Sequence, residues 1–390
     1  MYKIIPFLFS PLLASAWTPA STEGSDYLAA ESLEILTNVV NNGSLAEHLV
    51  TLGVSQTCNI SKAVVRREYS NLSDDEKLEY TAAVQCLMSL PAKVSPHLVP
   101  GAKSRYDDFV ATHINQTDFI HQNGPFLFWH RLFMWTFEQT LRDECGYTGY
   151  LPYWNYGKSA EDILNSPYFD GSETSQGGNG VYQEHNDTVI TPLVTIPSET
   201  GGGCITGPYA NNMANISATE PFFSGVKTGE LFAYEPRCIR RDISTNLAQS
   251  WATDNYTVDQ LTNPDFQTDF GAFQNQLDNV GSNTNGRWPL HLYGHYAMNG
   301  DPGGDFYNSP NEPMFWLNHA NIDRLWWIWQ NQKPIDRAFM INGTMTTGNE
   351  PPSADATMED IIDMGDYVGG SSAIKHHVST VAGQYCYIYL

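Results

Sequence analysis

Six histidines in two groups of three limit what this chain can fold into more than any other feature of its sequence. Imidazole is the commonest nitrogen ligand for copper, zinc and iron. No cysteine lies within either group, so thiolate ligands are excluded there. Three imidazoles per group predict two metal ions, each with open positions for an outside ligand. The candidate ligands are His113, His121 and His130 for one ion and His291, His295 and His319 for the other.

The first group combines helix and loop positions. Apolar residues over 106–113 follow the i, i+3, i+4, i+7 spacing of a buried helix face, and His113 continues that face. Pro125, preceded by a glycine, interrupts the chain between His121 and His130. We therefore expect His121 in a loop and His130 on a helix that begins near Pro125.

The second group has a helical spacing of its own. His291 and His295 are four positions apart, so one helix face can supply two ligands to one ion. His319 lies within an apolar stripe over 315–329. A buried imidazole without a partner costs about 1 to 3 kcal/mol, so His319 needs a hydrogen bond or a metal. Asp323, one turn further, is expected to hydrogen-bond to a ligand ring and hold it in place.

The composition excludes several classes of partner. The chain has 43 acidic residues against 20 Lys and Arg, for a formal net charge of -23. Such a field repels phosphate backbones and anionic lipids, so nucleic acid and membrane surfaces are not expected partners. Hydrophobic residues make up 41% of the chain, which is enough for a large core and excludes wholesale disorder.

The N-terminus predicts secretion. A lysine precedes an apolar run over 4–13, and a small-residue cleavage site ends at Ala16, so residues 1–16 read as a secretory signal peptide. A buried N-terminal helix is the alternative, and Pro6 and Pro11 disfavour it. No other stretch approaches the roughly 18 unbroken apolar residues of a membrane span.

The cysteines and the glycosylation signals also predict secretion. Six cysteines without a CxxC pair fit three disulfides, and of the 15 possible pairings we predict only Cys204 with Cys238. Both lie in one Gly-rich stretch. Eight N-x-Ser/Thr signals favour a glycosylated, extracellular protein. The acceptors are Asn42, Asn59, Asn71, Asn115, Asn186, Asn215, Asn255 and Asn342.

The coarse pattern is mainly helical. Amphipathic helices are predicted over 27–53 and 73–90. Residues 158–240 and 345–372 are rich in Gly, Ser and Asn or Pro, which predicts long irregular connections with few short strands. No linker separates two cores, so residues 17–390 are expected to form one domain.

Three segments, 121–131, 151–155 and 311–324, resemble the two copper signatures of the type 3 copper proteins. That family contains tyrosinases, catechol oxidases and haemocyanins. The resemblance covers roughly residues 55 to 390. It implies a four-helix bundle core in which the first histidine triplet binds one copper and the second triplet binds another, with O2 as co-substrate. It also implies that Phe315 packs beside the second site, and we expect Phe315 and Leu292 to line the substrate pocket.

The chain departs from the family pattern near both sites. Phe119 stands where many fungal and plant members have a thioether-forming cysteine, so no thioether is expected. In members that hydroxylate monophenols, an Asn follows the first histidine of the second triplet and an upstream Glu helps it hold a water. Here Leu292 occupies that position, and no Glu occurs over 236–311. Asp278 or a copper-bound hydroxide is the alternative base.

These features predict a secreted oxidase that converts o-diphenols to o-quinones while O2 is reduced to water, with o-aminophenols as further candidate substrates. A tyrosinase with substantial monophenol hydroxylation is the main alternative, and a haemocyanin-like oxygen carrier or a zinc-stabilised structural protein are alternatives from other classes. Tyr387 and Tyr389 resemble the motif that closes the catalytic domain, which predicts a form without a C-terminal lid domain. The expected partner is a small phenol, and the oligomeric state stays open.

Overall fold

The computed structural model describes residues 17–191, 194–279 and 287–390. The predicted signal peptide, residues 1–16, lies outside the described residues. Helices dominate the described chain, as predicted, and none of them is long and apolar enough to cross a membrane.

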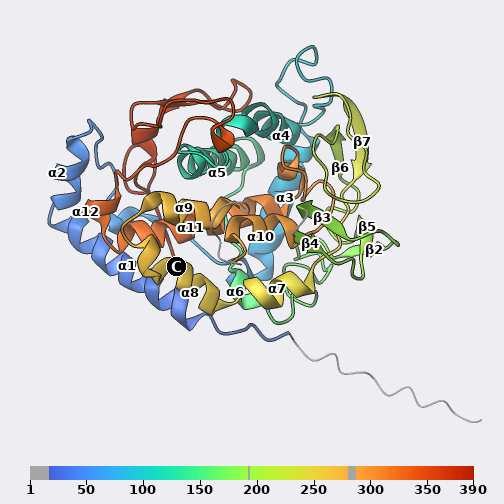
Figure 1. Cartoon of the computed structure of the whole chain (residues 1–390), viewed down its shortest axis with the longest axis horizontal. Coiled ribbons are helices and arrows are strands. Elements are labelled where there is room, and N and C mark those ends of the chain that lie inside the picture. Colours follow the sequence, from blue (N-terminus) through green and yellow to red (C-terminus); the bar gives the residue numbers. More distant parts are fainter. Residues whose placement is uncertain (1–16, 192–193, 280–286) are drawn as a thin grey trace, which may run out of the picture.

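Four helices form the core that the sequence predicted. They are α4 (Arg105–Gln116), α5 (Phe126–Cys145), α10 (Leu290–Tyr296) and α11 (Met314–Asn331). Helix α11 runs through the middle of the molecule, where it contacts α5, α10 and α1 (Figure 1). Every residue of α11 is buried, so the apolar stripe read from the sequence is one side of a helix covered all round.

The single helix predicted over 27–53 is interrupted in the structure. In its place the chain forms two helices, α1 (Glu23–Asn41) and α2 (Ser44–Val50). Gly43 separates them with φ of 82°, a left-handed conformation that glycine adopts without a steric penalty. The remaining α-helices are α3 (Asp74–Ser89), α6 (Tyr156–Ser159), α7 (Thr245–Trp251), α8 (Asp254–Thr262), α9 (Phe270–Asp278) and α12 (Pro334–Arg337).

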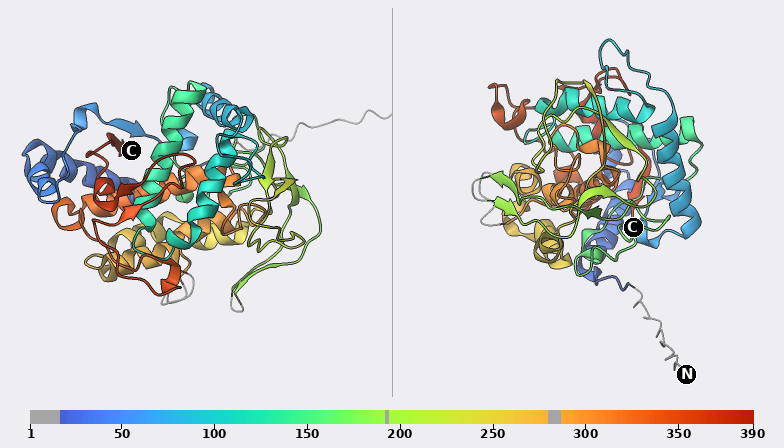
Figure 2. Two further views of the ribbon diagram at one scale, coloured as in Figure 1. Left: turned by 90° about the horizontal axis from the view of Figure 1, so that it is seen from above. Right: turned by 90° about the vertical axis from the view of Figure 1, so that its right-hand side faces the viewer.

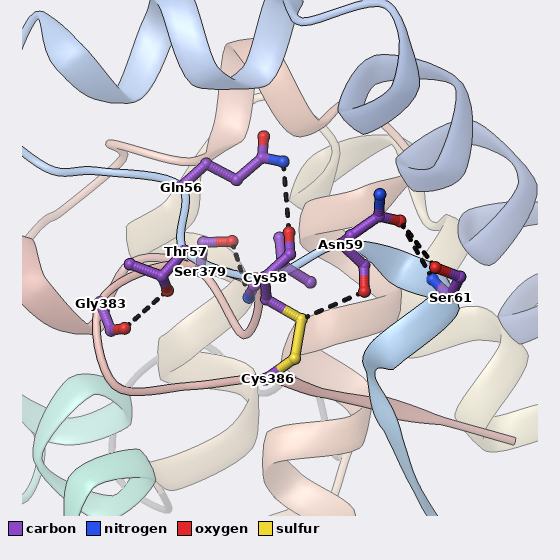
Figure 3. The surroundings of a disulfide bond; sticks show 9 residues. Gln56, Thr57, Cys58, Asn59, Ser61, Ser379, Gly383 and Cys386 are labelled. Atoms are coloured by element: carbon purple, nitrogen blue, oxygen red, sulfur yellow. Dashed lines mark hydrogen bonds between the residues drawn. A yellow bond between two sulfur atoms is a disulfide. The ribbon is translucent and has the colours of Figure 1, made fainter.

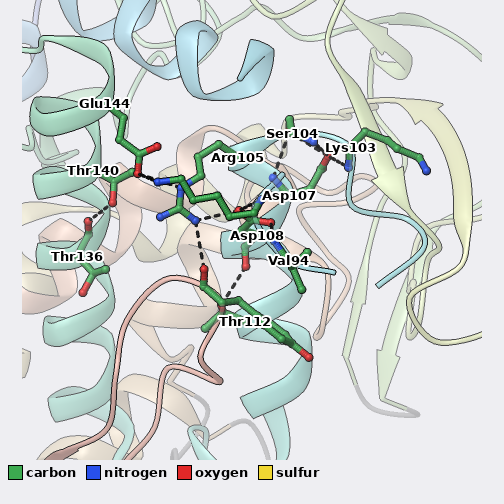
Figure 4. Close-up of polar contacts among 12 residues, drawn as sticks. Val94, Lys103, Ser104, Arg105, Asp107, Asp108, Thr112, Thr136, Thr140 and Glu144 are labelled. Carbon is green, nitrogen blue, oxygen red and sulfur yellow. Dashed lines mark hydrogen bonds and ion pairs between the residues drawn. The ribbon is translucent and has the colours of Figure 1, made fainter. Parts of the chain in front are cut away.

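A capping box fixes the start of α4, the helix that carries His113. The Ser104 hydroxyl accepts the Asp107 N–H at 3.1 Å, and the Asp107 carboxylate accepts the Ser104 N–H at 2.8 Å. Arg105 then bridges Asp108 on its own helix and Glu144 near the end of α5 (Figure 4). Helices α4 and α5 are thus tied together at the ends remote from their histidines.

The strands are short and pair in twos. Strand β1 lies parallel to β10, whereas β2 with β5, β3 with β4, β6 with β7 and β8 with β9 are antiparallel. Strands β2 to β7 gather at one end of the molecule, within the stretch predicted as irregular (Figures 1 and 2). The strands are β1 (Val64–Arg66), β2 (Gly180–Tyr182), β3 (Thr188–Thr191), β4 (Val194–Ile196), β5 (Gly202–Ile205), β6 (Met213–Ile216), β7 (Tyr234–Cys238), β8 (Ile361–Ile362), β9 (Ser372–Ala373) and β10 (Tyr387–Tyr389).

All six cysteines form disulfides, so none is left for a thioether. The predicted pair Cys204–Cys238 is confirmed. A second disulfide, Cys86–Cys145, joins α3 to the end of α5. The third, Cys58–Cys386, fastens the segment before β1 to the one before β10 (Figure 3).

Candidate metal centre

The first histidine triplet comes from two helices and the loop between them. His113 lies on α4 and His130 on α5, and His121 lies in the loop, as expected. In each ring the Nδ1–H donates to a backbone carbonyl: Tyr307 for His113 at 2.8 Å, Thr117 for His121 at 3.1 Å and Phe126 for His130 at 2.8 Å. Each hydrogen bond leaves Nε2 unprotonated and free to bind a metal.

Two of these Nε2 atoms need a ligand. The Nε2 atoms of His113 and His130 are buried and have no hydrogen-bond partner in the described chain. An unprotonated buried nitrogen without a partner is unfavourable, and a metal ion satisfies it. One nitrogen from each of the three rings lies within 4.8 Å of the others, so they can share one ion.

The second triplet converges more tightly. The His291 and His295 Nε2 atoms are 3.0 Å apart, and they lie 3.2 and 3.3 Å from the His319 Nε2. A first-row metal binds imidazole nitrogen at roughly 2.0 Å, so three nitrogens at this spacing surround one ion. Helix α10 provides two of them and α11 the third, as the helical spacing predicted.

The two triplets face each other and form one binuclear centre. The His130 and His319 rings stack with centroids 4.4 Å apart, and His121 and His291 stack at 6.1 Å. Burial lowers the pKa of all six rings, to about 4 for His121 and about 3 for His291. The rings are therefore neutral at pH 7, the form that binds metal.

Aromatic side chains surround the centre. The Phe315 ring lies 4.1 Å from His319, 5.4 Å from His113 and 5.8 Å from His295, measured between centroids. It therefore packs beside both triplets, whereas the resemblance implied only the second. Phe126 contacts one ring of each triplet, His130 of the first and His291 of the second.

A pocket of about 290 Å³ opens onto three of the ligands, His121, His291 and His295. Of the two residues expected to line it, Leu292 does so, whereas Phe315 is not among the lining residues. Tyr296 and Phe306 also line it, and the Phe306 ring lies 4.7 Å from that of His121. No motif in the sequence pointed to these two aromatic residues.

The expected role of Asp323 is wrong. Its Oδ1 accepts a hydrogen bond from Arg131 at 2.7 Å, and its Oδ2 accepts one from each of the Tyr387 and Tyr389 hydroxyls at 2.6 Å. Both oxygens are thus occupied, and no ligand ring reaches them. Asp323 also forms ion pairs with two buried arginines, Arg131 at 2.7 Å and Arg66 at 3.7 Å, and Arg66 has Glu138 as a second partner. Arg131 follows His130 on α5 and Asp323 lies on α11, so the Arg131–Asp323 ion pair joins these two helices.

Asp278 does hold a ligand ring. Its Oδ1 lies 2.7 Å from the His291 Nδ1. Its Oδ2 accepts the backbone N–H of Gln122 at 2.7 Å. Both oxygens are occupied, and Asp278 is not among the pocket-lining residues. The alternative in which Asp278 deprotonates an incoming phenol is therefore wrong, because the carboxylate lies behind the His291 ring.

Residues 103–332 match the family model described as the common central domain of tyrosinase. The chain belongs to the tyrosinase family. The resemblance to type 3 copper proteins is thereby confirmed, and this tyrosinase-family oxidase is a dicopper protein that uses O2. The two histidine triplets are the groups that fit its copper ions.

Several fungal proteins are similar along most of their length. Tyrosinase P of Aspergillus terreus is 35% identical over 349 residues, which cover 87% of this chain and 95% of that protein. N-acetyl-6-hydroxytryptophan oxidase of Emericella nidulans is 34% identical over 354 residues, covering 86% of this chain and 94% of that protein. A solved structure of a Thermothelomyces thermophila polyphenol oxidase variant superposes with a TM-score of 0.85 at 36% identity, covering 94% of this chain and 98% of that one.

Proposed function

We propose that this tyrosinase-family oxidase is a secreted o-diphenol oxidase. Two o-diphenols are oxidised to two o-quinones, and the four electrons and four protons that they lose reduce one O2 to two waters. The copper pair, when bound, supplies the electron transfer between diphenol and oxygen. O-aminophenols carry the same pair of adjacent oxidisable groups and are candidate substrates of the same kind.

The observation that carries the proposal is the lack of a free base in the pocket. A phenol has a pKa near 10 and gains from a positioned base before it can be hydroxylated. Asp305 carries the one carboxylate among the described pocket-lining residues. Its oxygens accept four backbone N–H groups, from Thr219, Glu220, Tyr307 and Asn308. Leu292, beside His291, can neither accept a proton nor orient a water.

The remaining pocket residues suit a phenolic ring. Phe306 is half-buried beside His121 and offers an aromatic face. Leu292 and Tyr296 are both buried and add side-chain carbon surface to the lining. These side chains exclude water around a bound ring and leave its hydroxyl groups directed to the histidine ligands.

Steady-state kinetics on matched pairs test the proposal. The ratio of kcat/KM for 4-methylcatechol to that for p-cresol, and for dopamine to that for tyramine, is expected to exceed ten. Leu292→Asn offers a matched variant, because Asn can orient a water beside His291, and it should narrow both ratios. Equal efficiency of the wild type on monophenol and diphenol, measured without added diphenol, contradicts the proposal.

Monophenol hydroxylation is the second candidate function. It is favoured by the names of the relatives, since a tyrosinase from Aspergillus terreus covers most of this chain. Oxidation of a 6-hydroxyindole is a related possibility, because the Emericella nidulans relative is named for such a substrate. The same kinetic comparison, extended to 6-hydroxyindole, separates these activities. The open pocket and the oxidase names of the relatives favour an enzyme over an oxygen carrier.

We also propose that the chain is processed after residue 16, that it is glycosylated, and that residues 17–390 form one domain. Three disulfides support an oxidising compartment. Seven of the eight predicted acceptor asparagines are exposed, and Asn215 is the exception. Its Nδ2, the atom that would carry the glycan, donates to the buried Asp107 at 2.9 Å. N-terminal sequencing and glycopeptide mapping of the secreted protein should show Ala16 removed and Asn215 unmodified.

A further inference from the structure

We infer that Asp278 is a positioning residue that links the two copper-binding triplets and sets their relative placement. The inference rests on the dicopper centre and not on the proposed preference for diphenols. Asp278 is the last residue of α9 and is 2% exposed. Its two oxygens point to different triplets, one to His291 and the other to the residue after His121.

The contact with His291 fixes one ligand of the second triplet. The carboxylate Oδ1 accepts from Nδ1–H at 2.7 Å, so Nε2 stays unprotonated and faces His295 and His319. In the first triplet all three rings donate to neutral backbone carbonyls instead. A charged acceptor makes the imidazole a stronger donor to a metal than a neutral carbonyl does. His291 is therefore the ligand that Asp278 both orients and strengthens.

The contact with Gln122 fixes the loop of the first triplet. The Gln122 backbone has φ of 46°, a left-handed conformation that is unfavourable for a residue with a side chain. The Asp278 Oδ2 accepts the N–H of this residue at 2.7 Å and so stabilises the turn directly after His121. One turn earlier on α9, the Gln274 side chain donates to the Asn123 carbonyl at 2.7 Å. The end of α9 thus holds the His121 loop by two hydrogen bonds.

The two contacts together make one carboxylate a bridge between the triplets. The ligand rings that these contacts hold, His121 and His291, stack at 6.1 Å with an interplanar angle of 22°. A shift of Asp278 moves both rings, whereas a shift of Gln274 moves only the loop that carries His121 and leaves His291 in place. This difference separates a role in aligning the metals from a role in holding the loop.

The test compares Asp278→Asn with Gln274→Ala. An asparagine has one acceptor oxygen and cannot serve both N–H donors. Copper per chain is measured by elemental analysis, copper affinity by competition with a chelator, and pairing of the ions by electron paramagnetic resonance of the oxidised protein. Two Cu(II) ions held together are silent in that spectrum, and separated ions give a signal. Circular dichroism confirms that each variant is folded.

We expect Asp278→Asn to bind copper 10- to 100-fold more weakly and to give a Cu(II) signal at full loading. Gln274→Ala should stay silent with two coppers bound. Asp278→Glu, which keeps the charge, should recover part of the affinity lost in Asp278→Asn. If Asp278→Asn does not fold, Asp278→Glu alone decides, because its longer side chain cannot keep both 2.7 Å contacts and should give a signal. Wild-type affinity with a silent spectrum in the folded Asp278 variant overturns the inference, as does an equal signal from Gln274→Ala.

Discussion

At the scale of single residues, the metal centre depends on which nitrogen of each imidazole carries the proton. Backbone carbonyls fix this for His113, His121 and His130, and a carboxylate fixes it for His291. These acceptors come from segments that the histidine spacing does not reveal. The identity of the ligands could be predicted from sequence, but the groups that orient them could not.

Replacing His295 with alanine should empty the second copper site, because that site loses one of its three ligands. The expected result is about one copper per chain instead of two, with loss of diphenol oxidation. Elemental analysis of the purified variant measures the copper content. His97→Ala is a suitable control, since His97 is exposed and belongs to neither triplet. Two coppers and full activity in His295→Ala would show that the second triplet is wrongly assigned.

The copper-free protein should lose stability as the pH falls from about 6.5 to about 4. The pKa of His121 is lowered from 6.5 to about 4 and that of His291 to about 3, because burial disfavours the charged ring. The unfolded chain takes up these protons first, so acid favours unfolding across this window. Asp278 acts oppositely: burial raises its pKa to about 6, so its contribution is complete below pH 3.8 and lost as the pH rises through 6. Burial also raises the pKa of four other carboxyls, so five in all offset part of the effect of the six rings. The other four are Glu68, Asp107, Glu220 and Asp305.

Thermal midpoints of the copper-free protein between pH 7.5 and 4.5 measure this effect. The midpoint temperature should decrease as the pH is lowered below 6.5. Bound copper should reduce this decrease, because a ligated nitrogen cannot take up a proton. A midpoint that stays constant over this range would contradict the assignment of the rings as buried and neutral.

At the scale of elements, local signals predicted helix starts better than helix packing. The sequence predicted a helix over 73–90, and a capping box of Ser73 and Glu76 starts α3 there. A similar box starts α4 with Ser104 and Asp107. By contrast, the apolar stripe of α11 did not predict that the opposite side of this helix is buried as well. Hydrophobic periodicity shows which helix face is apolar, but it does not show which segments cover the polar face.

Replacing Ser104 with alanine should lower the free energy of unfolding by about 1 to 2 kcal/mol, because the cap is buried and its loss leaves the Asp107 N–H without a partner. Ser73→Ala, in the exposed box of α3, should cost only about 0.5 to 1 kcal/mol. Urea denaturation of the copper-free proteins provides both values. A smaller loss for Ser104→Ala than for Ser73→Ala would argue against a stabilising role for the α4 cap.

At the scale of the whole molecule, disulfides and one buried charge network close the chain around the helical core. Cys58–Cys386 spans 328 residues and Cys86–Cys145 spans 59. Next to the longer link, Asp323 joins the hydroxyls of β10 to Arg131 on α5. The C-terminal segment is therefore part of the support of the metal centre.

Removing the Cys58–Cys386 disulfide should destabilise the protein more than removing Cys86–Cys145. The loop-closure model gives a difference of about 1.5 kcal/mol for loops of 328 and 59 residues. Paired Cys→Ser variants, compared by urea denaturation, measure it. A larger loss for the shorter loop would mean that local contacts, and not chain entropy, determine the contribution of these links.

The sequence by itself determined the six ligands, the helical class, one disulfide and the family, because each is recorded in short spacings or in a motif. Tertiary structure alone decided that Asp278 holds His291 and that Asp323 faces two arginines and two tyrosines. It also placed Phe306 and Tyr296 in the pocket. The physical reason is range: a helical turn brings i and i+4 together in any protein, whereas contacts between distant segments depend on how the helices cross and which buried charges must be balanced.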